Sequence, residues 1–379
     1  MARLEEICSI NMGQSPESSS YNKNGEGMPF FQGNADFGEL HPMVRIWCNA
    51  PTKIAECGDI LISVRAPIGA LNIADKQCCI GRGLAALTVN EAICFPRYLL
   101  YCLECKVDEL NSKGTGSTFK AINKQTLSET EIPLPPLEEQ RRIAATLDKV
   151  NDLIAKRRAQ LDELDLLVKA RFVEMFGDPV LNPMKWPEQP LKNIADIVSG
   201  ITKGRKTKET ELIEVPYMAV SNVKDGYIDW TTVKTILATK SEIEQYRLLP
   251  NDVLMTEGGD PDKVGRGAII KRPLENSIHQ NHIFRVRLNE DIILPSYFAE
   301  YLQHNKAKQY FLRCAKQTTG IASINMKQIK ELPTLLPPQN MQLIYDYYMR
   351  GIDCNKLIIS RGLNKLVVLK KSLIQKYFG

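Results

Sequence analysis

The sequence contains an internal repeat, and this repeat constrains the fold more than any other feature. The pattern Leu-x-x-Ile-x-x-Ile-x-x-Gly of residues 4–13 returns in residues 191–200, 187 positions later. Phe176-Gly177 returns as Phe378-Gly379, 202 positions later. Self-similarity over such a distance indicates that one folding unit occurs more than once in a chain. We therefore expect two copies of a unit that is about half the chain in length.

The distance between matching positions changes along the unit. It grows from 187 residues at the start to 202 at Ile122-Asn123, which matches Ile324-Asn325, and it stays at 202 to the end of the unit. The second copy thus carries 15 additional residues in its first part. This drift predicts a module of variable length joined to a module of fixed length.

The first module of each copy has the pattern of a mixed α/β domain. Short apolar runs at 59–64 and 253–256 are bounded by glycine and proline, as strands and turns are. Prolines then cluster at 133–136 and 333–338. Because proline is tolerated in the first turn of a helix but not in its interior, each cluster predicts the end of the module and the start of a helix.

A long amphipathic segment follows each proline cluster, over residues 137–176 and 339–378. Its apolar residues are spaced alternately by four and three, which is typical of a coiled-coil helix about 60 Å long. The stripe consists of Ile143, Leu147, Val150, Ile154, Leu161, Leu164, Val168 and Met175, and of Tyr345, Met349, Ile352, Ile359, Leu363, Leu366, Leu373 and Tyr377. We expect the two helices to pair antiparallel, with two separate surface helices as the alternative.

The composition excludes several classes of protein. Of the 379 residues, 44% are hydrophobic and 25% are charged, which excludes wholesale disorder and a disulfide-dense miniprotein. The net charge of +5 permits nucleic-acid binding without requiring it. The sequence has no run of about 18 apolar residues and no signal-peptide pattern at its N-terminus. We therefore expect a cytoplasmic protein that does not interact with a membrane.

No motif of the sequence predicts catalysis or a cofactor. Gly204-Arg205-Lys206-Thr207 lacks the upstream glycine of a phosphate-binding loop, and no Asn-Pro-Pro-aromatic or Asp-Pro-Pro-Tyr run exists to hold a flipped base. Cys102-x-x-Cys105 has no second pair with which to bind zinc, so we expect the ten cysteines to be reduced, buried or idle. His279 and His282 lack identifiable carboxylate partners, so we expect no metal.

The order of these motifs, repeated twice, resembles the DNA sequence-specificity (S) subunit of bacterial type I restriction–modification systems over the whole chain. The resemblance rests on residues 13–16, on the runs 58–63 and 252–256, and on the polar loops before Ile122 and Ile324. Its most specific part is Ile-Pro-Leu-Pro-Pro-Leu-Glu-Glu-Gln-Arg-Arg-Ile at 132–143. The second copy keeps Pro337-Pro338 and the glutamine but lacks the acidic pair, which leaves the chemistry of its helix start open.

The resemblance implies an α+β architecture of two target-recognition domains in tandem, each followed by a spacer helix. The boundaries are residues 1–136 and 178–338 for the domains, and 137–177 and 339–379 for the helices. It implies a bipartite double-stranded DNA target, with one half-site for each domain and a gap set by the helices. It also implies two DNA methyltransferase subunits as partners, ATP-dependent restriction subunits in the full complex, and adenine methylation as the outcome.

Basic and polar residues in loops are the candidates for DNA contact, because Lys and Arg bind phosphates and polar side chains read base edges. The candidates of the first copy are Arg65, Arg82, Lys113, Ser117, Thr118, Lys120 and Asn123. Those of the second copy are Lys203, Arg205, Lys206, Lys208, Lys263, Arg266, Gln317, Thr318 and Asn325. Asn123 is also expected to cap the following helix. Charges of the long helices, such as Arg157, Arg158, Lys356 and Lys370, are expected to serve helix register, partner subunits or nonspecific backbone contact.

Three classes of function remain at this point. The favoured hypothesis is a DNA-reading scaffold without an active site. An enzyme with an unrecognised site, such as a nuclease or methyltransferase, is a second. A coiled-coil adaptor that binds proteins only is a third, and it would show no salt-dependent affinity for DNA.

Overall fold

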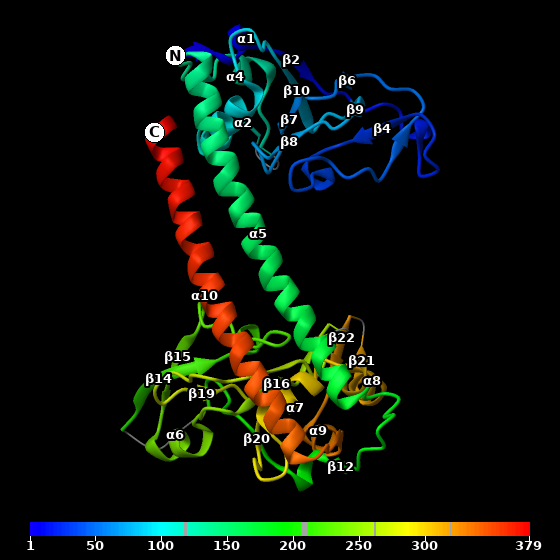
Figure 1. The fold of residues 1–379 in the computed structure, drawn as a ribbon, viewed down its shortest axis with the longest axis vertical. Helices are drawn as coiled ribbons and strands as arrows, with labels where there is room; N and C mark the ends of the chain where they lie inside the picture. The colour runs from blue at the N-terminus through cyan, green and yellow to red at the C-terminus, as the bar shows by residue number, and fades with distance from the viewer. Residues whose placement is uncertain (117–119, 206–210, 261–262, 319) are drawn as a thin grey trace. The chain divides into compact units, whose positions relative to one another are not determined.

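The computed structural model describes residues 1–379 except for 117–119, 206–210, 261–262 and 319 (Figure 1). The described residues form two compact units. Unit 1 comprises Met1–Arg158 together with Arg361–Gly379, and unit 2 comprises Ala159–Ser360. The long helices α5 (Leu137–Phe176) and α10 (Gln339–Phe378) coincide with the two predicted helical segments, and each contributes one part to each unit.

The centre of unit 1 is an antiparallel sheet with the strand order β2-β10-β7-β8. These strands are Cys8–Met12, Leu84–Val89, Ile60–Ser63 and Leu71–Ile73. A second sheet contains β3 (Tyr21–Asn22), β5 (Trp47–Cys48), β4 (Met28–Phe31), β9 (Cys78–Ile80) and β6 (Ile54–Ala55), and β1 (Ala2–Arg3) pairs with β11 (Glu131–Ile132). The helices are α1 (Leu4–Ile7), α2 (Pro96–Cys105), α3 (Val107–Ser112) and α4 (Lys124–Ser128).

Unit 2 repeats this plan with a sheet in the order β13-β20-β16-β18. These strands are Ala195–Ser199, Ile283–Leu288, Val253–Thr256 and Gly267–Ile269. The other strands are β14 (Ile213–Met218), β15 (Lys234–Ala238), β19 (Ile278–His279), β17 (Gly258–Gly259), β21 (Lys316–Thr318), β22 (Ile321–Ser323), β12 (Glu188–Pro190) and β23 (Pro333–Leu335). The helices are α6 (Lys240–Tyr246), α7 (Pro295–Tyr301), α8 (Asn305–Cys314) and α9 (Met326–Lys330).

The two central sheets share their register, so the sequence repeat is a structural repeat. Leu87 on β10 pairs with Ile10 and Ile60, and Val286 on β20 pairs with Ile197 and Val253, which are the matching positions of the second copy. The variable module differs between the copies in its connections. Helix α6 stands between β15 and β16, where unit 1 has the short strand β6 instead.

Both long helices close the hydrophobic core of each unit. In unit 1, Ile143 and Leu147 of α5 belong to a core against which Leu373 and Tyr377 of α10 pack. In unit 2, Phe172 and Phe176 of α5 both pack with Tyr345 of α10 in edge-to-face ring contacts. Within each unit the start of one helix therefore lies beside the end of the other, which is the predicted antiparallel pairing. Val150, Ile154 and Val168 of the predicted stripe are also buried.

The described part of the chain has neither a membrane-crossing helix nor a cluster of metal ligands. No described helix combines the length and apolar content that crossing a bilayer requires. No three His, Cys, Asp or Glu side chains gather among the described residues as metal ligands would. None of the ten cysteines, all of which are described, forms a disulfide, and burial raises the pKa of the Cys102 thiol well above its usual value.

Candidate nucleic-acid interface

In each unit, three loops meet at the end of a central strand. In unit 1, Val64 after β7 donates its N–H to Gly83 O (2.9 Å) and accepts from Ile122 N (2.9 Å). In unit 2, Glu257 after β16 donates its N–H to His282 O (3.0 Å) and accepts from Ile324 N (2.8 Å). Equivalent positions of the two copies thus join the same three loops.

One of these loops is the turn between β9 and β10, residues 80–84, and its counterpart between β19 and β20, residues 279–283. We call it the connecting turn. Gly81 N donates to Phe31 O (2.8 Å), and Leu84 N donates to Gly81 O (3.0 Å). In unit 2, Gln280 N donates to Met218 O (2.9 Å), and Ile283 N donates to Gln280 O (2.9 Å). The backbone of the turn is therefore held alike in both units.

The side chains on the connecting turn differ between the units. In unit 1 the turn carries Arg82 between two glycines, and a Cβ at Gly83 would lie 2.4 Å from Gln32 O, so glycine is required there. Arg82 is exposed, and its N–H donates to Ser15 Oγ (3.2 Å). In unit 2 the turn carries Gln280, Asn281 and His282.

The structure brings several predicted contact residues of unit 1 together around this turn. Ala66 N, next to Arg65, donates to Lys120 O (3.0 Å), so Arg65 and Lys120 lie on adjacent loops. Both side chains are exposed, as is Lys113, which forms an ion pair with Glu109 (2.6 Å). An exposed ion pair of this kind contributes little to stability, so Lys113 stays available to a phosphate. Ser117 and Thr118 lie outside the described residues.

The predicted contact residues of unit 2 differ in their surroundings. Lys203 is exposed, Lys263 is exposed and paired with Asp260, and Nε of the half-buried Arg266 has no hydrogen-bond partner among the described residues. Arg205, in contrast, forms a largely buried ion pair with Glu242 and donates to Leu237 O (3.2 Å). Lys206 and Lys208 lie outside the described residues, and Gln317 and Thr318 are described by their backbone on β21 alone.

The pairing of Arg205 gives it a structural role. Glu242 also accepts from Thr239 N (2.9 Å) in the capping box of α6. The ion pair therefore holds the Arg205 side chain at the start of that helix. The guanidinium holds the pKa of the Glu242 carboxyl below its usual range. Arg205 is predicted to contact DNA together with Lys203, Lys206 and Lys208, and its partner Glu242 lies 37 residues away in the sequence.

Asn123 and Asn325 cap the helices that follow them. Asn123 Oδ1 accepts from Thr126 N (2.9 Å) at the start of α4, which confirms the predicted cap. Asn325 Oδ1 accepts from Gln328 N (3.0 Å) at the start of α9. Both oxygens are thus engaged in the protein, although both residues are exposed beside the loops of the site.

Glu257, Asn281 and His282 are not among the residues predicted to contact DNA, yet the structure brings them together beside these loops. His282 Nδ1 lies 2.5 Å from Glu257 Oε2, and both residues line a hollow of about 320 Å³ with Gly258, Gly259 and Ser323. The sequence analysis treated His282 as a metal-ligand candidate without a partner. Aligning the two copies at the connecting turn would have matched Asn281 to Arg82.

His279, in contrast, belongs to the core. It is fully buried, and its Nδ1 lies 3.1 Å from Ile283 O, to which it donates. Burial, assisted by the nearby Arg285, lowers the pKa of His279 to about 4. The ring is therefore neutral at physiological pH.

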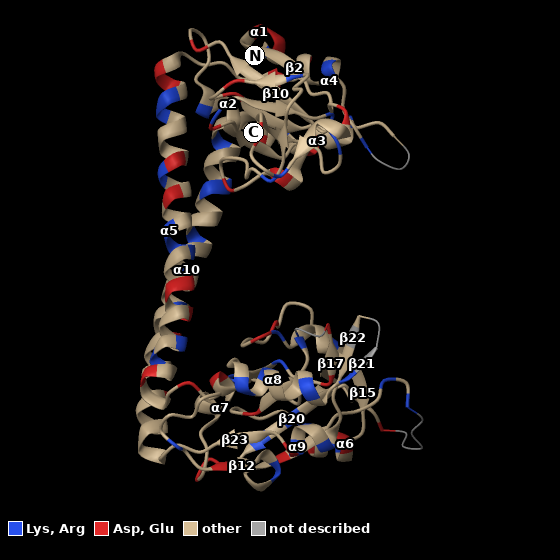
Figure 2. Ribbon diagram, turned by 90° about the vertical axis from the view of Figure 1, so that its right-hand side faces the viewer, with Lys and Arg blue, Asp and Glu red and all other residues tan. Residues whose placement is uncertain are grey.

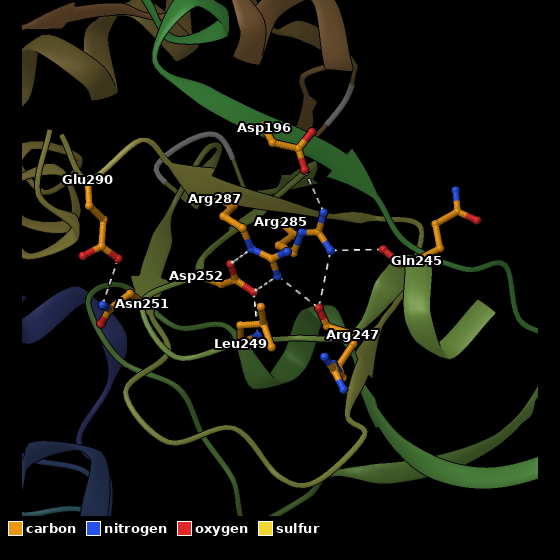
Figure 3. A network of polar contacts seen from close by, with 9 residues as sticks. All are labelled: Asp196, Gln245, Arg247, Leu249, Asn251, Asp252, Arg285, Arg287 and Glu290. Carbon is orange, nitrogen blue, oxygen red and sulfur yellow. Dashed lines mark hydrogen bonds and ion pairs between the residues drawn. The ribbon is translucent and has the colours of Figure 1, made fainter. Parts of the chain in front are cut away.

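Two arginines of β20 take part in an internal network rather than an exposed surface (Figure 3). Arg285 donates to Asp196 Oδ2 (2.9 Å), and Arg287 donates to both oxygens of Asp252 (2.7 and 2.8 Å). Asp252 also accepts from Leu249 N (2.7 Å), which fixes the turn before β16. These cations are neutralised within unit 2, so we do not include them among the DNA contacts.

Charged residues of both signs follow each other along the two long helices (Figure 2). The helices also expose apolar side chains. Lys370 of α10 pairs with Glu104 of α2 (2.7 Å), and Lys356 pairs with Asp165 of α5, so both lysines hold elements of their own unit together. The more exposed apolar side chains on the helices are Leu166, Leu167, Leu343, Ile344, Tyr347, Ile358 and Val368. Large contiguous apolar patches on a surface commonly mark contacts with other proteins.

Comparison with known proteins places this architecture in a family. The family profile described as "Type I restriction modification DNA specificity domain" matches residues 1–165 and 183–358. The chain belongs to the type I restriction–modification DNA specificity family. The two matched ranges correspond to the two copies of the repeat, so the predicted family is confirmed.

Two curated relatives in this family carry the same designation. The putative type I restriction enzyme MjaX specificity subunit of Methanocaldococcus jannaschii is 46% identical over 161 residues, which cover 42% of this chain and 38% of that protein. The type I restriction enzyme EcoKI specificity subunit of Escherichia coli K12 is 26% identical over 247 residues, which cover 62% of this chain and 53% of that protein. Both are named as specificity subunits, in line with the prediction of a recognition subunit.

A solved structure shows that the fold is shared over the whole chain. The type I restriction–modification S subunit from M. genitalium has a TM-score of 0.60 and 17% identity, and the match covers 100% of this chain and 95% of that one. The predicted α+β fold with two tandem domains and long helices is thus confirmed.

Proposed function

We propose that this chain is the DNA-recognition subunit of a type I restriction–modification complex and reads a bipartite target. The main support for the proposal is that the site formed by the three loops occurs in both units. The same three loops meet at the same strand end in both units, but they present different side chains. A duplicated scaffold with different reading groups suits a target whose two half-sites differ in sequence, with each unit entering the major groove of one half-site.

The long helices set the gap between the half-sites and hold the partner subunits. They have the same length in both copies, whereas the first module varies in length. Their exposed apolar side chains provide docking surfaces for two methyltransferase subunits, and restriction subunits join in the full complex. Catalysis of adenine methylation and ATP-dependent restriction belongs to those partners, and the chain itself needs no cofactor.

The test is base-modification sequencing of the host genome with and without the gene. The proposal expects that one gapped, two-part motif loses its methylated adenine when the gene is deleted. A salt titration of DNA binding by the purified complex then separates a DNA reader from an adaptor that binds proteins only, because phosphate contacts give a steep dependence on salt. An unchanged methylation pattern together with binding that does not respond to salt would contradict the proposal.

A further inference from the structure

At the connecting turn the two units differ in the chemistry of their side chains while they share backbone hydrogen bonds. Its hydrogen bonds place Asn281 where unit 1 has Arg82, and His282 where unit 1 has Gly83. Unit 1 therefore presents one guanidinium, and unit 2 presents an amide and an imidazole. A rigid backbone with exchangeable side chains is suited to reading sequence.

Glu257 fixes the orientation of the His282 ring. Its carboxylate Oε2 lies 2.5 Å from Nδ1, which therefore carries the hydrogen and donates it. In the neutral ring this tautomer leaves Nε2 as a hydrogen-bond acceptor. The backbone of Glu257 is itself held by both neighbouring loops, through His282 O (3.0 Å) and Ile324 N (2.8 Å). The carboxylate is thus presented from a well-anchored position.

The surroundings of this pair are open to a ligand. About half of the His282 side chain is exposed (55%), and the ring borders the hollow of about 320 Å³ beside Gly258 and Gly259. Asn281 Nδ2 lies 3.4 Å from His282 Nε2, so the two polar groups form one small surface, and a base that binds Nε2 takes the place of this long contact. Because the glycines leave the hollow free of bulky side chains, the edge of a base can approach this surface.

We propose that His282 and Asn281 read one base or two adjacent bases in the half-site of unit 2, with Glu257 as the positioning residue, and that Arg82 takes the same position in unit 1. This inference rests on the proposed DNA recognition. An imidazole acceptor suits the amino group of cytosine or adenine, and an asparagine amide suits adenine. An arginine suits guanine O6 and N7. The two turns therefore select bases of different hydrogen-bonding type.

The test uses the full chain assembled with its methyltransferase subunits and duplexes in which each base pair of the target is replaced singly. His282→Ala is expected to reduce discrimination about tenfold at one position or two adjacent positions in one half-site, and to leave the other half-site unchanged. Glu257→Ala is expected to affect the same position. Glu257→Gln keeps an acceptor oxygen for Nδ1 and should retain most of the discrimination.

Two further variants show which half-site each residue affects. Arg82→Ala is expected to reduce discrimination in the opposite half-site, and Glu275→Ala, an exposed residue of unit 2 outside the site, is the matched control. Thermal unfolding of each variant reports whether the fold is intact, and His282→Gln serves as the milder substitution if His282→Ala lowers the melting temperature.

The outcomes separate this inference from the proposed function. Unchanged base preferences in both His282 variants and in Asn281→Ala would overturn the inference while leaving the proposed function standing. A uniform loss over all positions of the half-site would also overturn it, because it would show a structural role. A wild-type complex without any base preference would overturn both.

Discussion

Gln140 and Gln342 occupy the same position in the two long helices and make the same three hydrogen bonds. Gln140 Oε1 accepts from Phe95 N (2.8 Å), while its Nε2 donates to Ile93 O (3.0 Å) and Pro135 O (2.8 Å). Gln342 does the same with Leu294 N (2.8 Å), Ile292 O (3.2 Å) and Pro337 O (2.8 Å).

This relationship explains why the proline cluster is followed by a glutamine in both copies. Both side chains are fully buried, and each joins the start of a long helix to the loop before α2 or α7. The acidic pair that precedes Gln140 is absent before Gln342, yet α10 begins at Gln339 all the same. The buried amide, rather than the acidic pair, is the feature common to both helix starts.

The first prediction concerns this amide. Gln342→Leu is expected to lower the free energy of unfolding by roughly 2–4 kcal/mol, because it leaves the buried N–H of Leu294, the buried Pro337 O and the partly buried Ile292 O without this partner. Gln140→Leu should cost a similar amount. Denaturant unfolding of the full chain measures both, with Gln375→Leu, on the exposed face of α10, as the control. A loss no larger than that of the control would contradict the assignment.

The second prediction concerns pH. Because the pKa of His279 is about 4 in the folded chain and about 6.5 when unfolded, the unfolded state binds more protons between these values. Stability is therefore retained above pH 6.5 and lost as the pH falls toward 4. The loss from this group is about 2 kcal/mol between pH 7 and pH 5.

His279→Asn tests this dependence, since an amide can still donate to Ile283 O but does not titrate. We expect the variant to lose less stability than the wild type when unfolding is compared at pH 7 and pH 5. His41→Asn, at an exposed position, is the control. The same pH dependence in His279→Asn and in the wild type would assign the effect to other groups.

The third prediction concerns phosphate contacts. Lys120→Gln is expected to weaken DNA binding about equally for all sequences and to reduce the slope of log K against log salt by about one. Lys149→Gln, which removes the same charge from the exposed face of α5, should change the slope less. Titrations of the assembled complex between about 50 and 200 mM salt give both slopes. Equal changes in the two variants would show that Lys120 acts only through net charge.

The fourth prediction concerns the gap. Since α5 and α10 pair antiparallel in each unit, a heptad must be inserted into both helices, after Arg158 and after Ser360, to keep the apolar stripe continuous. Seven helical residues add about 10 Å, which corresponds to about three base pairs of DNA. The methylated motif is expected to keep both half-sites and gain about that many unspecified positions. A changed half-site in base-modification sequencing would refute the role of the helices as a spacer.

The fifth prediction concerns a domain exchange, which tests whether each unit reads its half-site independently. Exchange of residues 1–133 for the equivalent segment of another family member is expected to change one half of the motif and to preserve the other half. Base-modification sequencing reads both halves at once. If both halves changed while the chain remained folded, each unit would not be reading its half-site independently.

The features that sequence could predict are those with a local or periodic signature. Spacing predicts the buried positions Ile143, Leu147, Val150, Ile154 and Val168, and a residue type at a helix start predicts the cap at Asn123. The ion pair of Arg205 with Glu242 has no such signature, because tertiary folding joins residues that are far apart in the sequence. The same holds for Glu257 and His282, which are 25 residues apart and meet through the sheet.

Unit 1 is built from the beginning of the chain and from residues 361–379, whereas unit 2 is continuous. A ribosome therefore synthesises every residue of unit 2 before it makes the last turns of α10, which pack against the core that contains Ile143 and Leu147. At about 5–20 residues per second, the first unit waits roughly 10–40 s with that apolar surface uncovered. During this interval the nascent chain is exposed to chaperones and to misassembly, so the unit translated first is the one that finishes folding last.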